Sequence, residues 1–201
     1  RVSPGQFTTG DRAFDDAVMV RGDPTALTAL LDAETRTMLA KLCAAGGEIA
    51  SRVLSVDSRI PADDAAQVET AVLQGIAIAQ RLRPVVDTDV VRRLAKNALT
   101  DPEPAVRRLN LELLGHLPSG GDTAASTFRA AMGDVDARIR LTAALLLGAE
   151  GRPVLLALAG DPATPADVGL EAIDALGDGC PADHAILHLG RALKTGRLAP
   201  V

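Results

Sequence analysis

The sequence predicts a mostly α-helical fold, in which helix pairs stack as an α-solenoid behind a small α+β segment. A fifteen-residue pattern occurs three times along the chain. The 201 residues include three Phe and neither Tyr nor Trp, so Ala, Leu, Val and Ile must build the core. Ala and Leu are strong helix formers. We expect residues 1–60 to form the α+β segment, as the end of a truncated domain, and residues 61–201 to form the helical repeats.

The three copies of the pattern begin at Asp101, Asp134 and Asp161 and share one spacing of apolar residues. The first reads "DPEPAVRRLNLELLG" and the second "DVDARIRLTAALLLG"; the third, "DPATPADVGLEAIDALG", is looser. In each copy, the side chains at offsets 0, 4, 5 and 8 from an aliphatic residue share one helix face, and a glycine at offset 9 is expected to end the helix. Second helices are expected near residues 123–132, 153–159 and 182–193. Since one such pair cannot bury its apolar stripe alone, the copies are expected to stack as layers.

The stretches before and between the copies carry other local signals. Residues 17–22, "AVMVRG", are typical of a short strand. Asp23-Pro24 favours a helix start, with the aspartate as N-cap. Further helices are expected over residues 32–45, 61–82 and 89–99, and one or two strands over residues 48–58. Thr164 and Asp167, three places apart, have the spacing of a capping box.

The first two copies resemble the bacterial HEAT-like repeat of the phycobilisome-lyase type, whose pattern is roughly D-x-x-x-x-V-R-x-x-A-x-x-x-L-G. The residues that match are Asp101, Val106, Arg107, Leu114 and Gly115 in the first copy, and Asp134, Ile139, Arg140, Ala143, Leu147 and Gly148 in the second. Asn110 stands where the first copy should have Ala, and Gly169 replaces the arginine in the third. The resemblance covers about residues 62–195 and implies helix pairs whose surfaces hold protein partners. Residues 9–42 are similar to a segment that precedes such repeats in uncharacterised bacterial proteins.

Composition and charge argue against several other classes of function. The net charge is −5, and both halves carry more acidic than basic residues. A nucleic-acid-binding protein needs a basic surface and aromatic stacking platforms, so we expect no nucleic-acid partner. Two distant cysteines, Cys43 and Cys180, favour a reducing compartment, and we expect a cytoplasmic protein. No apolar run is long enough for a membrane span, so no membrane insertion of this segment is expected.

Four residues of the repeats are candidate partner-binding residues: Arg107, Arg108, Asn110 and Arg140. Arg107 and Arg140 each lie six places after an aspartate. They form either a row that recognises acidic partners or a structural ladder that bonds carboxylates or carbonyls of a neighbouring turn. The second alternative is the one we favour. A partner is expected at the exposed helix faces and at the loops around residues 101–104, 134–136 and 161–164.

The last helix brings together residue types that can bind zinc. Cys180, His184 and His188 recur every four residues. The spacing matches no closed zinc motif, and three ligands on one straight helix converge poorly on one ion. We therefore expect no metal and no cofactor, and interpret the histidines as partly buried. His184 and His188, with Arg191 and Lys194, are also expected to give the end of the array a polar outer face.

Taken together, these features favour a non-catalytic protein–protein interaction scaffold over an enzyme. The sequence offers no recognisable nucleophile with a base, no pair of carboxylates suited to acid–base work and no dinucleotide-binding glycine motif. One alternative is a HEAT-like lyase or a chaperone for a cofactor protein. A further alternative is a regulatory or linker region of a larger multidomain protein, which the start at Arg1 rather than Met also suggests.

Overall fold

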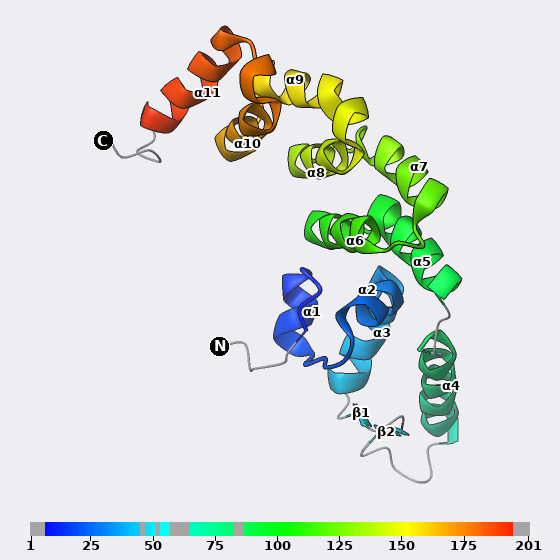
Figure 1. Ribbon diagram of the computed structural model, residues 1–201. Helices are drawn as coiled ribbons and strands as arrows, with labels where there is room; N and C mark the ends of the chain where they lie inside the picture. Colours follow the sequence, from blue (N-terminus) through cyan, green and yellow to red (C-terminus); the bar gives the residue numbers. More distant parts are fainter. Residues whose placement is uncertain (1–6, 45–46, 51–52, 57–64, 83–86, 195–201) are drawn as a thin grey trace. The chain divides into compact units, whose positions relative to one another are not determined.

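The chain is mostly α-helical in the computed structural model shown in Figure 1. The structure describes residues 7–44, 47–50, 53–56, 65–82 and 87–194. It divides into two compact units, Arg1–Leu113 and Leu114–Val201, which we call unit 1 and unit 2. This division lies within a helix of the first repeat copy and not at residue 60, so the domain boundary expected there stays a prediction.

Unit 1 is built from short helices, one hairpin and the first part of a longer helix. Its elements are α1 (Arg12–Ala17), α2 (Pro24–Leu30), α3 (Ala33–Ala44), β1 (Gly47–Ala50), β2 (Val53–Val56), α4 (Ala65–Arg81), α5 (Asp87–Thr100) and most of α6 (Pro104–His116). The strands β1 and β2 pair antiparallel, with Gly47 opposite Val56 and Ala50 opposite Val53. Within this unit, α3 packs against α1 and α4, and α2 packs against α5. The main apolar cluster consists of Phe14, Val18, Leu31, Leu39, Leu42 and Ile78.

The strand expected at residues 17–22 is absent, because a helix occupies its first residue. The Asp11 side chain accepts the backbone N–H of Phe14 and so caps α1, which ends at Ala17. Val20 instead forms an isolated antiparallel bridge with Phe7, whose N–H donates to the Val20 carbonyl at 3.0 Å. The expected helix start at Asp23-Pro24 is confirmed, since the Asp23 side chain accepts the N–H of Ala26.

A buried ion pair joins α3 to the loop that opens the first repeat copy. The Arg36 guanidinium, 2 % exposed, donates two hydrogen bonds to the Asp101 carboxylate, at 2.8 and 2.9 Å. It also donates to a carboxylate oxygen of Asp11 at 2.9 Å and to the Leu31 carbonyl at 2.9 Å. Asp101 is 5 % exposed and accepts the N–H of Glu103 as well. The arginine thus fixes the conformation of the loop from a position 65 residues earlier in the chain.

The Asp32 carboxylate, which precedes α3, makes the stability of unit 1 depend on pH. Burial raises the pKa of Asp32, but the Thr35 hydroxyl, the Thr35 N–H and the Arg81 guanidinium together hold it below its ordinary value. A carboxyl whose pKa is lowered on folding stabilises the fold above its unfolded pKa of about 3.9, and loses that contribution as the pH falls through its folded pKa.

We expect the free energy of unfolding to fall as the pH drops below about 4. In the Asp32→Asn variant, the free energy of unfolding should depend less on pH in this range. Urea unfolding at pH 7, 5 and 3.5 measures both effects. An Asp32→Asn variant with the pH dependence of the unmodified chain would contradict the role given to this carboxylate.

Unit 2 contains the rest of α6 and five further helices. These are α7 (Gly121–Ala131), α8 (Ala137–Leu147), α9 (Arg152–Gly160), α10 (Ala166–Leu176) and α11 (Ala182–Lys194), with 3₁₀ turns η1 (Gly148–Gly151) and η2 (Gly177–Gly179). Each of α7 to α10 packs against the next helix along the chain, α8 also contacts α10, and α9 also contacts α11. One core cluster joins the second and third copies: Leu141, Ala144, Leu155, Leu158, Ala159, Val168, Ala172 and Leu176.

Two of the three glycines at offset 9 end their helices as expected. Gly148 and Gly177 follow α8 and α10 with φ angles of 58° and 52°. Their ψ angles of −119° and −134° place them outside the left-handed helical region, in a conformation open to glycine almost alone. The expectation is wrong for Gly115, which lies inside α6. A Cβ at Gly115 would lie 2.5 Å from Cδ2 of Leu146, so this glycine allows a close contact with α8.

The expected capping box at Thr164 and Asp167 is not formed. The residue that precedes α10 is Pro165, which has no side chain able to accept a cap hydrogen bond. Thr164 lies one place too early and is 2 % exposed. Asp167 lies in the first turn, where its carboxylate pairs with Arg138 of α8. Arg138 also pairs with Glu171, so one arginine ties α8 to α10 at the surface.

The last helix turns its histidines inward, which confirms the burial expected for them and corrects the polar outer face that they were also expected to form. His188 is fully buried and His184 half-buried, while Ile186 is 71 % exposed and Leu189 is 42 % exposed. A Cβ at Gly169 would lie 2.6 Å from Nε2 of His188, and one at Gly160 would lie 2.8 Å from Nε2 of His184. Gly169 therefore replaces the repeat arginine at the place where the imidazole of His188 packs. The side chains of Arg191 and Lys194 lie outside the described part of the structure.

Because the His188 ring leaves no room for a Cβ, we expect Gly169→Ala to lower the free energy of unfolding by about 1–3 kcal/mol. Urea unfolding followed by circular dichroism measures the loss. The matched control is Gly190→Ala in α11, where no atom lies within 4 Å of the added Cβ. This control should leave stability unchanged or raise it by up to about 1 kcal/mol. A second change, His188→Ser, should restore part of the loss; equal stability of Gly169→Ala and the unmodified chain would contradict the packing.

One described stretch, Ala137–Gly160, is long and apolar enough to cross a membrane by length and composition alone. It consists of α8, the turn η1 and α9, and α8 packs against α9. Neither helix reaches the ~20 residues that a membrane-spanning helix needs. The stretch is weak evidence for a span.

Candidate functional site

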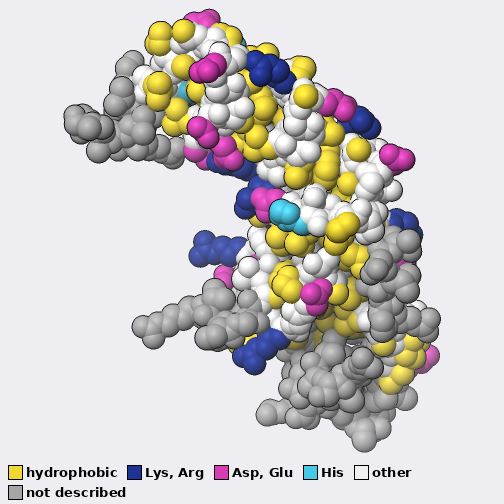
Figure 2. Space-filling model, in the orientation of Figure 1, with side chains coloured by type: hydrophobic (Ala, Val, Ile, Leu, Met, Phe, Trp, Pro, Cys, Tyr) yellow, Lys and Arg dark blue, Asp and Glu magenta, His cyan; other side chains and the backbone are white. Residues whose placement is uncertain are grey.

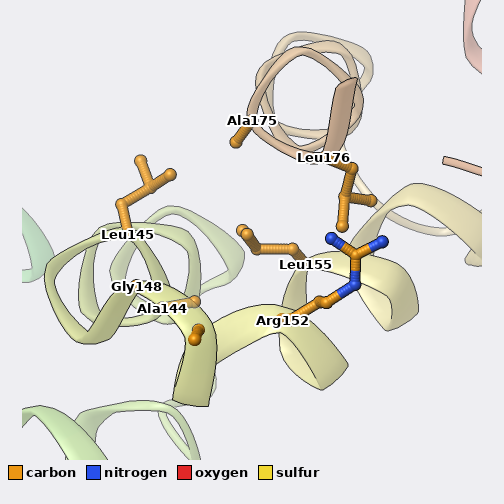
Figure 3. A pocket seen from close by; sticks show the side chains of 8 residues that line it. Ala144, Leu145, Gly148, Arg152, Leu155, Ala175 and Leu176 are labelled. Atoms are coloured by element: carbon orange, nitrogen blue, oxygen red, sulfur yellow. The ribbon is translucent and has the colours of Figure 1, made fainter. Parts of the chain in front are cut away.

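A surface hollow of about 360 Å³ lies between α8, α9 and α10, and we call it the α8–α10 hollow. It is lined by Ala144, Leu145, Gly148, Ala149, Arg152, Leu155, Ala175 and Leu176. Figure 3 shows Leu155 of α9 in the middle, between Leu145 of α8 on one side and Leu176 of α10 with Arg152 on the other. The residues come from the second and third repeat copies and from the helix between them, so the hollow is a product of their packing.

The hollow has an aliphatic floor and a partly polar lining, and it is open to solvent. Leu145 is 41 % exposed, whereas Leu155 and Leu176 are buried and form its floor. Hydrophobic side chains reach the surface between charged ones on the face of the molecule drawn in Figure 2. Exposed aliphatic side chains in a concave setting favour the binding of another apolar group, because its burial removes both surfaces from water.

Arg152 is the one charged residue that lines the hollow, and its exposed side chain crosses the turn η2 at a glycine. Its guanidinium donates a hydrogen bond to the Gly179 carbonyl at 3.1 Å. A Cβ at Gly179 would lie 2.8 Å from Cζ of Arg152, so the arginine can lie across the turn η2 only because residue 179 has no side chain.

The charge of Arg152 is not matched by a carboxylate in the described part of unit 2, where the ion pairs involve other arginines. The acid nearest to it in sequence, Glu150, is held by Arg129 through contacts of 2.5 and 3.0 Å. Hydrogen bonding to Arg129 holds the pKa of Glu150 below its ordinary value. The hollow therefore offers an arginine with unused donors beside an aliphatic floor.

The structure places the four sequence-predicted candidates in different surroundings and does not bring them together. Arg107 is buried, and its Nη1 donates to the carbonyls of Asp101 at 2.8 Å and Pro102 at 3.2 Å. Arg140 is half-buried, and its Nη1 donates to the carbonyls of Asp134 at 2.9 Å and Val135 at 3.1 Å. This is the carbonyl-bonding ladder favoured from sequence, with each arginine fixing the loop of its own copy.

The other two candidates differ in exposure. Asn110 is fully buried and donates to the Val106 carbonyl one turn earlier at 2.8 Å. Arg108 faces solvent and pairs with Glu112 at 2.8 Å. Of the four, Arg108 is exposed and Arg140 is partly exposed, and the partner-binding role of all four stays a prediction.

The three residues considered as zinc ligands each contact a different part of the protein. The Cys180 thiol lies 3.6 Å from the Pro181 carbonyl, and the two histidines pack against Gly160 and Gly169. Among the residues that the structure describes, no group of three or more His, Cys, Asp or Glu is placed to hold a metal ion.

Comparisons with known protein families, with curated proteins and with solved structures find no match to this chain.

Sequence reasoning missed the α8–α10 hollow because its lining residues come from both sides of a turn. Leu176 is the last of the four spaced apolar positions of the third copy, but Leu145 lies outside these positions in the second copy, and Arg152 lies between copies. One signal was present: Gly148 and Gly177 recur at the same offset, and an arginine follows the first of them by four residues.

Proposed function

We propose that this chain is a non-catalytic protein–protein interaction scaffold, built as an α-solenoid of HEAT-like helix pairs behind a small α+β segment. The serial packing of α7 to α11 and the core shared by the second and third copies support the solenoid. The helices α1 to α3 and the hairpin β1–β2 support the α+β segment. The proposed partner is a protein.

The observation that carries the proposal is the α8–α10 hollow. Its floor is aliphatic, and its one charged side chain is an arginine. Such a side chain binds anions and hydrogen-bond acceptors but does not exchange protons as an acid or base in catalysis. The chemistry of the hollow therefore suits recognition.

A photo-crosslinking amino acid placed at Leu145 tests the proposal directly. We expect irradiation in a lysate of the source cell to give a discrete adduct with a protein partner. The matched control carries the same amino acid at Ser126, which is exposed on α7 and does not line the hollow. An identical pattern of adducts from both positions, or none from Leu145, would count against a binding surface here.

A further inference from the structure

We propose that the α8–α10 hollow binds a peptide segment of its partner in which an aliphatic side chain lies next to a carboxylate. This inference rests on the proposed scaffold function and specifies the chemistry of the partner. The aliphatic side chain would contact Leu145, Leu155 and Leu176, and the carboxylate would accept hydrogen bonds from Arg152.

The first step concerns the charge of the ligand. Arg152 has a backbone carbonyl as its one hydrogen-bonded acceptor among the described residues, and no described carboxylate lies within ion-pair distance of it. A guanidinium has five N–H donors in a planar fork that matches a carboxylate. Because Arg152 is exposed, the N–H groups that it does not use are accessible to an anion that binds beside the aliphatic floor.

The second step concerns the location of the arginine. Gly179 leaves room for the guanidinium where it crosses η2, and one hydrogen bond to the Gly179 carbonyl directs it to the edge of the hollow. Figure 3 shows the guanidinium beside Leu176. A carboxylate bound by Arg152 would therefore lie next to the aliphatic floor.

The third step favours a peptide over a free hydrocarbon acid. Leu145 is 41 % exposed, so a single alkyl chain in the hollow would keep one side in water. A peptide brings its own flanking backbone, which covers the open side while one side chain fills the apolar floor. The hollow of about 360 Å³ is large enough for one or two aliphatic side chains and too small for a folded element.

Peptide titrations with the full chain test this inference by methyl NMR of the leucines. The probes are three short acetylated peptides with a central leucine, flanked by aspartate, by lysine or by glycine, and decanoate as a free acid. We expect the aspartate peptide to shift the methyl signals of Leu145, Leu155 and Leu176, with an affinity about tenfold above that of the lysine peptide. Decanoate should bind more weakly than the aspartate peptide.

Variants assign the preference to the arginine. Arg152→Gln should abolish the preference for aspartate over lysine, and Arg152→Glu should reverse it. Gly179→Ala, which displaces the guanidinium, should weaken binding of the aspartate peptide while leaving the glycine peptide unaffected. The control is Arg92→Gln on α5, which removes one positive charge from an exposed position that does not line the hollow and should keep the preference. Circular dichroism of each variant confirms that it is folded.

The outcomes separate this inference from the scaffold proposal. Equal binding of all three peptides, tighter binding of decanoate, or an unchanged preference in Arg152→Gln overturns the inference. The adduct at Leu145 described above would still support a scaffold in each case. If no peptide shifts the three leucines, the inference is wrong, and the scaffold proposal then depends on the adduct alone.

Discussion

Asp101→Ala should lower the free energy of unfolding by about 3–5 kcal/mol, because it leaves a buried guanidinium without its main partner. Arg36 is 2 % exposed and gives Asp101 two hydrogen bonds of 2.8 and 2.9 Å. Water cannot replace the lost carboxylate without opening the contact between α3 and the loop. Urea unfolding followed by circular dichroism measures the loss.

Asp134→Ala is the matched control for this change. Asp134 holds the equivalent place in the second copy, is half-buried, and accepts the N–H of Asp136 as Asp101 accepts that of Glu103. We expect a smaller loss than for Asp101→Ala, because Asp134 is half-buried and water can more readily replace its carboxylate. Equal losses from the two variants would show that the ion pair with Arg36 does not add to the free energy of unfolding.

The double variant Arg36→Met/Asp101→Leu should be more stable than Asp101→Ala. Replacing both members of a buried ion pair with apolar residues removes the unpaired charge. Asp11, which is bonded to Arg36 at 2.9 Å, is half-buried and can then be solvated. A double variant no more stable than the single one would mean that the cost of Asp101→Ala comes from the loop itself.

Gly151→Ala should destabilise unit 2 by about 3 kcal/mol, because the added methyl group meets backbone. A Cβ at Gly151 would lie 2.6 Å from both the Cα and the carbonyl carbon of Ala144. These atoms belong to α8 and cannot move as the end of a flexible side chain can. The φ and ψ of Gly151, −77° and −12°, are open to any residue, so contact and not backbone strain is the cause.

Gly148→Ala in the same turn separates the two effects. Its φ of 58° is strained for alanine, but no atom lies within 4 Å of the added Cβ. We expect a loss of about 1–3 kcal/mol from strain alone. Thermal or urea unfolding of both variants gives the comparison, and a Gly151→Ala variant as stable as the unmodified chain would refute the close approach of α8 and η1.

The helices of unit 2 could be predicted from the sequence because local signals agreed with the repeat. The spacing of apolar residues defines α8 and α10, and Gly148 and Gly177 end them. The same signals gave a wrong prediction where a side chain from another helix packs against the glycine. Gly115 lacks the positive φ of Gly148 and Gly177, so it does not end α6, and it packs closely against Leu146. Gly169, which stands in place of the repeat arginine, packs closely against His188.

The features that depend on long separations in sequence could not be predicted. Arg36 and Asp101 are 65 residues apart, and nothing in the local pattern pairs them. The sequence did predict partly buried histidines in α11, but the glycines against which His184 and His188 pack could not be identified from that helix alone. The α8–α10 hollow likewise follows from how three helices pack, and not from any one motif.

The stacking of successive helix layers is the central claim, and methyl nuclear Overhauser spectroscopy of the full chain tests it most directly. Leu141 of α8, Leu158 of α9 and Val168 of α10 belong to one buried cluster. We expect cross-peaks that link methyl groups of all three helices within this cluster. Methyl groups that show contacts only within their own helix would contradict the layered fold and, with it, the binding hollow between the layers.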